Sequence, residues 1–84
     1  MRNLEKWERK MLDEGNTYSF AHLVLELYPE ICAEAAFDFG DVVNRYRTRC
    51  DYSEGIFTLW SKTNAHGIRK YFFDTEMNFR GTKC

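Results

Sequence analysis

The chain has 84 residues, of which 44% are hydrophobic, 17% aromatic and 30% charged, and its formal net charge is −1. A chain of this length supports one hydrophobic core, which excludes a division into two independently stable domains without disulfides or metal. With five glycines, one proline and no repeated or low-complexity segment, the composition also excludes a long linker or a disordered arm.

The N-terminal residues alternate charged and apolar side chains and lack the apolar stretch of a secretory signal, and no run approaches the length of a membrane span. The three cysteines are an odd number without CxxC spacing, which argues against a disulfide framework. Both observations predict a cytoplasmic protein that does not enter membranes. Two buried thiols and one loose terminal thiol are expected.

A zinc site is the alternative use of these thiols. Cys32, Cys50, His66 and Cys84 are a sterically conceivable ligand set. Their spacing fits no usual pattern, because zinc ligands normally come in pairs that are close in sequence. We therefore predict no metal and no cofactor.

The net charge hides an asymmetry along the chain. Residues 1–41 carry four basic and nine acidic side chains, a net of −5, whereas residues 42–84 carry eight basic and four acidic ones, a net of +4. A basic C-terminal half suits an anionic partner, and an acidic N-terminal half suits water or a basic partner.

Helices are predicted over residues 3–14, 19–28, 30–39 and 41–50. Asn3, Ser19 and Asp41 stand where helix N-caps are favoured, and apolar residues follow each of them at helical spacing. Pro29 separates the second helix from the third, since proline ends one helix and suits the first turn of the next.

Gly40 leaves two interpretations open. It can close the third helix, after which Asp41 caps a fourth, or it can lie inside one long helix from Pro29 to Cys50 at a cost of about 1 kcal/mol. We prefer the break, because Asp41 and the arginines towards residue 50 match the charge preferences of a separate helix.

The spacing of the apolar residues changes after residue 55. Two runs rich in aromatic and β-branched residues, 56–61 and 68–74, are separated by a loop with Asn64 and Gly67, which predicts a β-hairpin. The remaining residues have no clear period, although Met77 and Phe79 are expected to pack against the core. The expected core comprises Trp7, Leu23, Leu27, Phe37, Val43, Tyr46 and Phe72.

The predicted fold is a small single α+β domain, with three to four helices followed by a hairpin over about residues 56–74. This order resembles a winged helix-turn-helix domain over roughly residues 4–74, and Ala36 and Gly40 have the four-residue spacing of that signature. The match is partial: Asp41 stands where an aliphatic residue usually follows the glycine, and Arg49 is polar at the last signature position. A second register, with the turn at residues 28–30, also fits.

The resemblance implies a small DNA-binding protein, such as a transcriptional regulator, whose helix 41–50 enters the major groove while the hairpin contacts the backbone. Asn44 and Arg45 would then read bases beside Thr48, and His66 would lie in the hairpin loop. The expected phosphate contacts are Arg47, Arg49, Lys62, Arg69 and Lys70.

Other interpretations stand beside this one. The same residues suit an ordinary solvated helix face next to a hairpin, and Glu34, Asp38 and Asp41 would repel phosphate. A second function is a small inhibitor or adaptor, of the kind that phages and mobile elements encode, which binds a host protein through acidic and aromatic surfaces. An enzyme is not predicted, because His22 and His66 lie in no nucleophile or metal motif. The sequence leaves the oligomeric state open.

Overall fold

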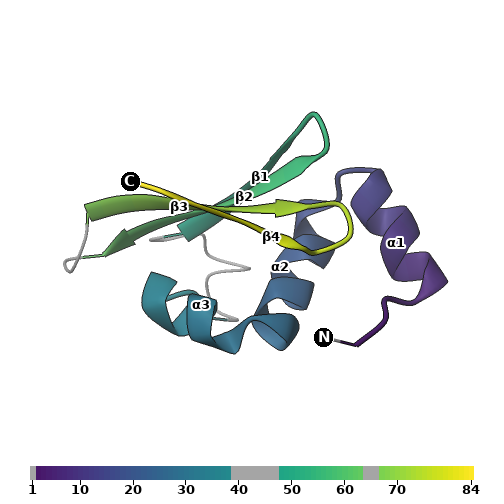
Figure 1. The fold of residues 1–84 in the computed structure, drawn as a ribbon, viewed down its shortest axis with the longest axis horizontal. Coiled ribbons are helices and arrows are strands. Elements are labelled where there is room, and N and C mark those ends of the chain that lie inside the picture. The colour runs from purple at the N-terminus through teal and green to yellow at the C-terminus, as the bar shows by residue number, and fades with distance from the viewer. Residues whose placement is uncertain (1, 39–47, 64–66) are drawn as a thin grey trace.

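The computed structural model describes residues 2–38, 48–63 and 67–84. Within these ranges the order of elements is α1 (Lys6–Asp13), α2 (Thr17–Leu27), α3 (Pro29–Ala35), β1 (Thr48–Ser53), β2 (Ile56–Thr63), β3 (Gly67–Asp74) and β4 (Phe79–Lys83). The strands follow the helices and form one antiparallel sheet in the order β1-β2-β3-β4 (Figure 1). None of the described helices has the length and apolar character needed to cross a membrane.

The first helices lie where the sequence predicts them, with different caps. Glu5, rather than Asn3, is the N-cap of α1, and its backbone N–H donates to the Glu8 carboxylate at 2.8 Å. Asn16, rather than Ser19, caps α2, because its side-chain oxygen accepts from the Ser19 backbone N–H at 2.9 Å. Pro29 opens α3 as expected.

The third helix is shorter than predicted. It ends at Ala35 because Ala36 adopts a left-handed conformation with φ 55°, so residues 37 and 38 lie outside the helix. The predicted helix 41–50 falls mostly outside the described residues, as does Gly40. Its last part is wrong, since residues 48–50 open strand β1. The structure does not confirm the winged-helix arrangement.

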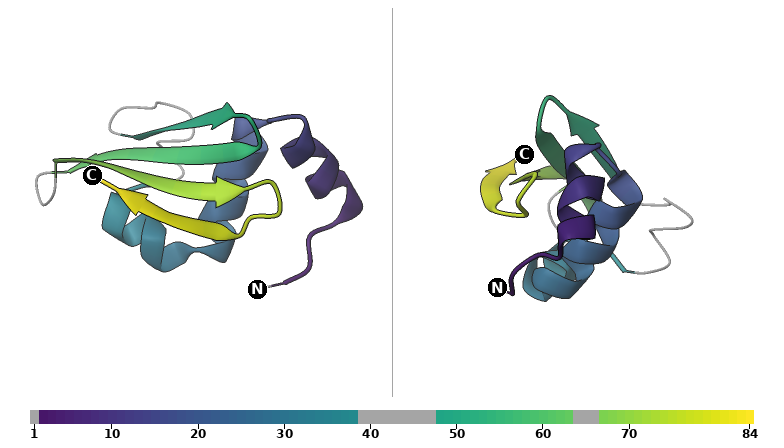
Figure 2. Two further views of the ribbon diagram at one scale, coloured as in Figure 1. Left: turned by 45° about the horizontal axis from the view of Figure 1, so that its top comes forward. Right: turned by 90° about the vertical axis from the view of Figure 1, so that its right-hand side faces the viewer.

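The predicted hairpin is confirmed and is part of a larger sheet. Strands β2 and β3 pair from Ile56↔Asp74 to Thr63↔Gly67, β1 adds on one side and β4 on the other. Figure 2 shows α2 and α3 on one face of this sheet, while α1 lies beyond the end that carries the β1–β2 and β3–β4 turns. We call the face towards the helices the inner face and the opposite one the open face, because none of the described helices covers it.

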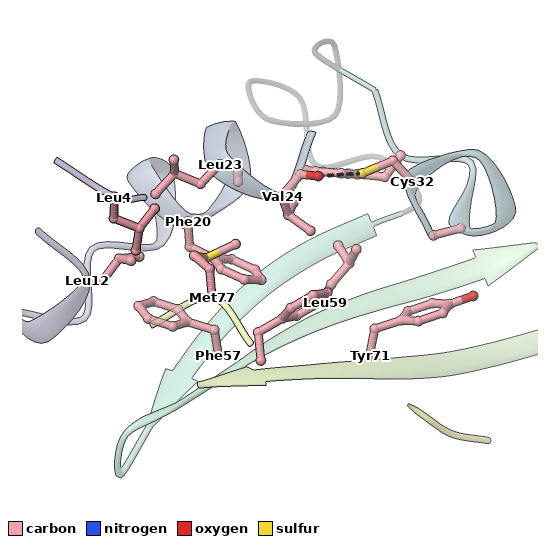
Figure 3. Close-up of a cluster of buried hydrophobic side chains, with 14 residues drawn as sticks. Leu4, Leu12, Phe20, Leu23, Val24, Cys32, Phe57, Leu59, Tyr71 and Met77 are labelled. Carbon is pink, nitrogen blue, oxygen red and sulfur yellow. Dashed lines mark hydrogen bonds between the residues drawn. The ribbon is translucent and has the colours of Figure 1, made fainter. Parts of the chain in front are cut away.

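The core lies between the inner face and α2 (Figure 3). Phe20 of α2 stacks on Phe57 at a centroid distance of 4.7 Å and contacts Phe73 at 5.4 Å. The predictions for Leu23 and Phe37 are confirmed, and Leu27 packs against the core while remaining partly exposed. Met77 is fully buried, as expected.

Two expected core residues face elsewhere. Trp7 is 63% exposed, because α1 turns Glu8 and Leu12 inwards instead. Phe72 lies on the open face, since alternation along β3 places its neighbour Phe73 on the inner one. Val43 and Tyr46 lie outside the described residues.

Candidate functional site

One row of residues crosses the open face of the sheet. Arg49 of β1 is the partner of Trp60 in β2, Trp60 is the partner of Lys70 in β3, and Lys70 is the partner of Lys83 in β4. Directly paired residues of antiparallel strands point to the same face. Three cationic side chains and one indole therefore share a single line across all four strands, which we call the basic row.

The indole of Trp60 organises this row. The Arg49 guanidinium carbon lies 4.5 Å from the ring centroid, and the Lys70 ammonium nitrogen lies 4.3 Å from it. The two cations come from the strands on either side of β2, so the indole lies between them. Each such contact contributes about 0.5–1 kcal/mol at an exposed site. The ring therefore holds two positive charges at fixed places above the sheet.

The carboxylates of this face are already engaged. Asp51 forms an ion pair with Arg49 at 3.2 Å, and both side chains are about half exposed. Asp74 accepts hydrogen bonds from the backbone N–H groups of Glu76 and Asn78, both at 2.9 Å, and so caps the turn into β4. Lys70 and Lys83 thus remain as a source of positive potential on the open face.

Apolar side chains lie among these charges. Phe72 follows Lys70 by two residues along β3 and therefore shares its face. Ile68 precedes Lys70 by two residues, is 53% exposed, and is the cross-strand partner of Lys62. The open face is consequently both basic and apolar, which distinguishes it from an ordinary solvated sheet surface.

The structure brings together Arg49, Lys62 and Lys70 from the predicted DNA contacts. Arg69 lies on the inner face and forms an ion pair with Glu34 of α3. Thr48 is buried beside Ser61, so it does not face a ligand. Asn44, Arg45, Arg47 and His66 lie outside the described residues, and their placement stays a prediction.

Trp60 and Lys83 were missed by the sequence reasoning. The predicted hairpin contains Trp60, but no face of the hairpin is predicted for it. The alternate positions Phe57, Leu59 and Ser61 already separate inner from outer residues of this strand. Lys83 was missed because β4 itself was not predicted. The two-residue period of this strand could therefore have placed Trp60 on the open face. Lys83 can be placed there only once the pairing of β3 with β4 is known.

The helices, which we call the helical side of the molecule, carry mainly acidic side chains, and several of these form ion pairs within the protein. Arg2 donates two hydrogen bonds to the carboxylate of Glu8, at 2.9 and 2.8 Å, and a third to Glu26. These bonds lower the pKa of Glu8 to about 2 despite its burial. The cluster of Arg2, Glu8 and Glu26 ties the N-terminal residues to α1 and α2 and has the character of a structural support.

The cysteines supply no evident reactive centre. Cys32 is buried and its thiol donates to the Val24 carbonyl oxygen at 3.4 Å (Figure 3), and burial raises the pKa of this thiol to about 11. A thiol of that pKa is a poor nucleophile at neutral pH. Cys50 is partly exposed and Cys84 exposed, and in the described part of the chain no group of three potential metal ligands comes together.

Comparison of the chain with protein-family models, with curated proteins and with solved structures found no match. We therefore infer the function from the geometry of the open face.

Proposed function

We propose that this protein binds nucleic acid through the open face of its sheet. The observation that carries the proposal is the arrangement of Arg49 and Lys70 around Trp60, with Lys83 in the same row and Lys62 on the same face. Phosphates of a nucleic acid backbone are the ligand that a row of cationic side chains fits.

The charge distribution favours binding by this one face over a general attraction of the whole protein to polyanions. The overall charge of −1 would not attract a polyanion to the molecule as a whole. The acidic residues are concentrated on the helical side, so attraction is confined to the open face and would orient the protein on its ligand. The major-groove role of residues 41–47 is not part of this proposal, because it required a helix that continues through residue 50.

The test is fluorescence anisotropy of labelled oligonucleotides titrated with protein at several salt concentrations. If the three lysines of the open face contact phosphates, the logarithm of the binding constant should fall with that of the salt concentration with a slope of about 2 to 3. Lys70→Gln should reduce the slope by about one unit. The matched control Lys10→Gln, at an exposed position of α1, should leave the slope unchanged. Binding weaker than about 10⁻⁴ M at physiological salt would refute the proposal.

A second candidate function is supported by the helical side. Trp7 and Tyr18 are the two most exposed large hydrophobic residues of the described chain, and Trp7 lines a shallow surface depression along α1 with Lys10 and Glu14. Exposed aromatic residues among charges are typical of protein-binding surfaces. An inhibitor or adaptor that binds a host protein should lose its partner on Trp7→Ala and keep it on Lys70→Gln, in a pull-down after nuclease treatment.

A further inference from the structure

The chemistry of the open face distinguishes between forms of nucleic acid. A duplex presents phosphates outwards and hides the faces of its bases, whereas a single strand presents both phosphates and unstacked bases. The open face interleaves cationic Lys62 and Lys70 with apolar Ile68 and Phe72. Packing such apolar groups against a phosphate backbone contributes little binding free energy, whereas packing them against bases contributes much more.

The width of the sheet gives an independent reason. Neighbouring strands lie about 4.8 Å apart, so four strands span about 14 Å between the outer backbones before side chains are counted. The major groove of DNA is about 12 Å wide and admits one helix or a two-stranded ribbon. The open face therefore cannot enter that groove as a unit, but it can support an extended single strand.

From these two observations we propose that the ligand of the open face is single-stranded nucleic acid. This inference rests on the proposed function and deepens it. Lys70 and Lys83 contact phosphates. The free side of the Arg49 guanidinium stacks on a base, since its other side lies over the indole, and a second base packs on Phe72 and Ile68.

Trp60 has a positioning role in this arrangement. Arg49 and Lys70, from the strands on either side of β2, both lie over its ring, so we assign the indole a role through these cations and not as a stacking partner of a base. Its removal should leave the two cations free to move and reduce affinity. Trp60→Phe retains an aromatic face for both cations and should restore most of the affinity, whereas Trp60→Leu retains bulk but no such face.

The experiment compares three fluorescein-labelled probes at one salt concentration: a 15-nucleotide oligothymidylate, a 15-nucleotide oligouridylate, and a 15-base-pair mixed-sequence duplex. We expect at least one single strand to bind about tenfold or more tightly than the duplex, since each of two stacked bases contributes about fivefold or more. The two single strands separate DNA from RNA as the source, and a preference for either supports the inference. A duplex that binds as tightly as both single strands overturns it while leaving the proposed function in place.

Variants and a competitor complete the test. Trp60→Leu should weaken single-strand binding about fivefold or more and Trp60→Phe by less than about twofold, with circular dichroism melting confirming that both are folded. Equal binding by folded Trp60→Leu would overturn the positioning role. Polyglutamate at matched charge should not displace oligothymidylate. If it does, the face is a general polyanion site and the single-strand inference is wrong.

The intrinsic fluorescence of Trp60 gives a direct readout of the same site. The chain has two tryptophans, so in a Trp7→Phe background the emission comes from Trp60 alone. Unlabelled oligothymidylate should quench or shift this emission with the same midpoint as the anisotropy titration. Binding without any change in Trp60 emission would place the ligand elsewhere and overturn the inference. Absence of binding to every probe would instead refute the proposed function itself.

Discussion

Both faces of the sheet carry apolar side chains, but their surroundings are opposite. On the inner face Phe57, Leu59, Tyr71 and Phe73 are fully buried against the helices. On the open face Trp60, Ile68 and Phe72 alternate with cations and stay partly or largely exposed. The same strands thus supply both sets through a two-residue period. The difference shows that the aromatic content of this chain exceeds what its described core uses, and that the surplus is gathered with positive charge on one surface.

The largest expected effect comes from breaking the inner face. Phe73 is fully buried and its ring contacts those of Phe20, Tyr28 and Phe79. Phe73→Ala should lower the free energy of unfolding by about 3–5 kcal/mol, because it removes the buried ring and leaves a cavity. Urea denaturation followed by circular dichroism measures this change.

Phe72→Ala is the matched control, since it removes the same side chain one residue earlier in the same strand. Its ring is on the open face and only partly buried, so the loss should be at most about 1.5 kcal/mol, in proportion to the smaller area removed from water. Equal losses at the two positions would mean that the faces are misassigned.

The next effect tests the contact between the helical layer and the inner face. Gly15, between α1 and α2, has φ +75°, and a Cβ there would lie 2.5 Å from the ring of Tyr52 in β1. Gly15→Ala should therefore lower the unfolding free energy by about 2–4 kcal/mol, through backbone strain and overpacking together.

Gly55 at the tip of the β1–β2 turn separates these two causes. Its φ of +80° is similar, but an added Cβ would meet nothing within 4 Å. Gly55→Ala should cost only about 1–2 kcal/mol, from the left-handed conformation alone. Thermal melting of both variants checks the order, and a larger loss at Gly55 would contradict the close contact of Gly15 with Tyr52.

The contrast between the faces also explains how far the sequence predicts the structure. The β2–β3 hairpin was predictable because β-branched and aromatic residues fill both its faces. Strand β1 was mistaken for the end of a helix, since Tyr46 and Cys50 have helical spacing while Cys50 and Tyr52 have strand spacing, and only pairing with β2 decides between them. Strand β4 contains Gly81 and few apolar residues, so its pairing with β3 overrides a weak local preference.

The sequence points to some of the basic residues of the candidate site and not to their geometry. Arg49, Lys62 and Lys70 were expected to contact phosphate from a helix and a hairpin, and the structure places them on one sheet face instead. Arg69 and Lys70 are both predicted as phosphate contacts from the resemblance to a winged helix-turn-helix domain. Adjacent residues in a strand point to opposite faces, which is why Arg69 meets Glu34 on the inner side.

A smaller effect concerns the charges on the helical side. Glu8→Gln removes the carboxylate that accepts from Arg2 and from the Glu5 backbone, and should lower the unfolding free energy by about 1–2 kcal/mol at pH 7. The folded-state pKa of Glu8, about 2, lies below its ordinary value of 4.5. Its contribution is therefore present above pH 4.5 and is lost as the pH falls from there towards 2.

Urea denaturation at pH 7 and at pH 3 measures this effect. The difference between parent and Glu8→Gln should shrink at the lower pH. Glu14→Gln, an exposed carboxylate at the other end of α1, is the control and should change stability by less than about 0.5 kcal/mol at both values. A Glu8→Gln difference that grows on acidification would contradict the sign of the pKa shift.

The smallest effect on stability is expected on the open face, where we propose that the charges serve binding. Arg49→Gln removes an exposed ion pair with Asp51 and a cation over Trp60, so the unfolding free energy should fall by less than about 1 kcal/mol. The same substitution should weaken the binding of single-stranded oligonucleotides, because it removes the guanidinium that stacks on a base. Arg80→Gln is the matched control, because the Arg80 side chain is also exposed, pairs with Asp74 at 3.9 Å and lies outside the basic row. It should be as stable as Arg49→Gln and should bind like the parent. If Arg49→Gln instead unfolds the protein and leaves binding unchanged, the basic row supports the fold, and the separation between a stabilising inner face and a binding open face is wrong.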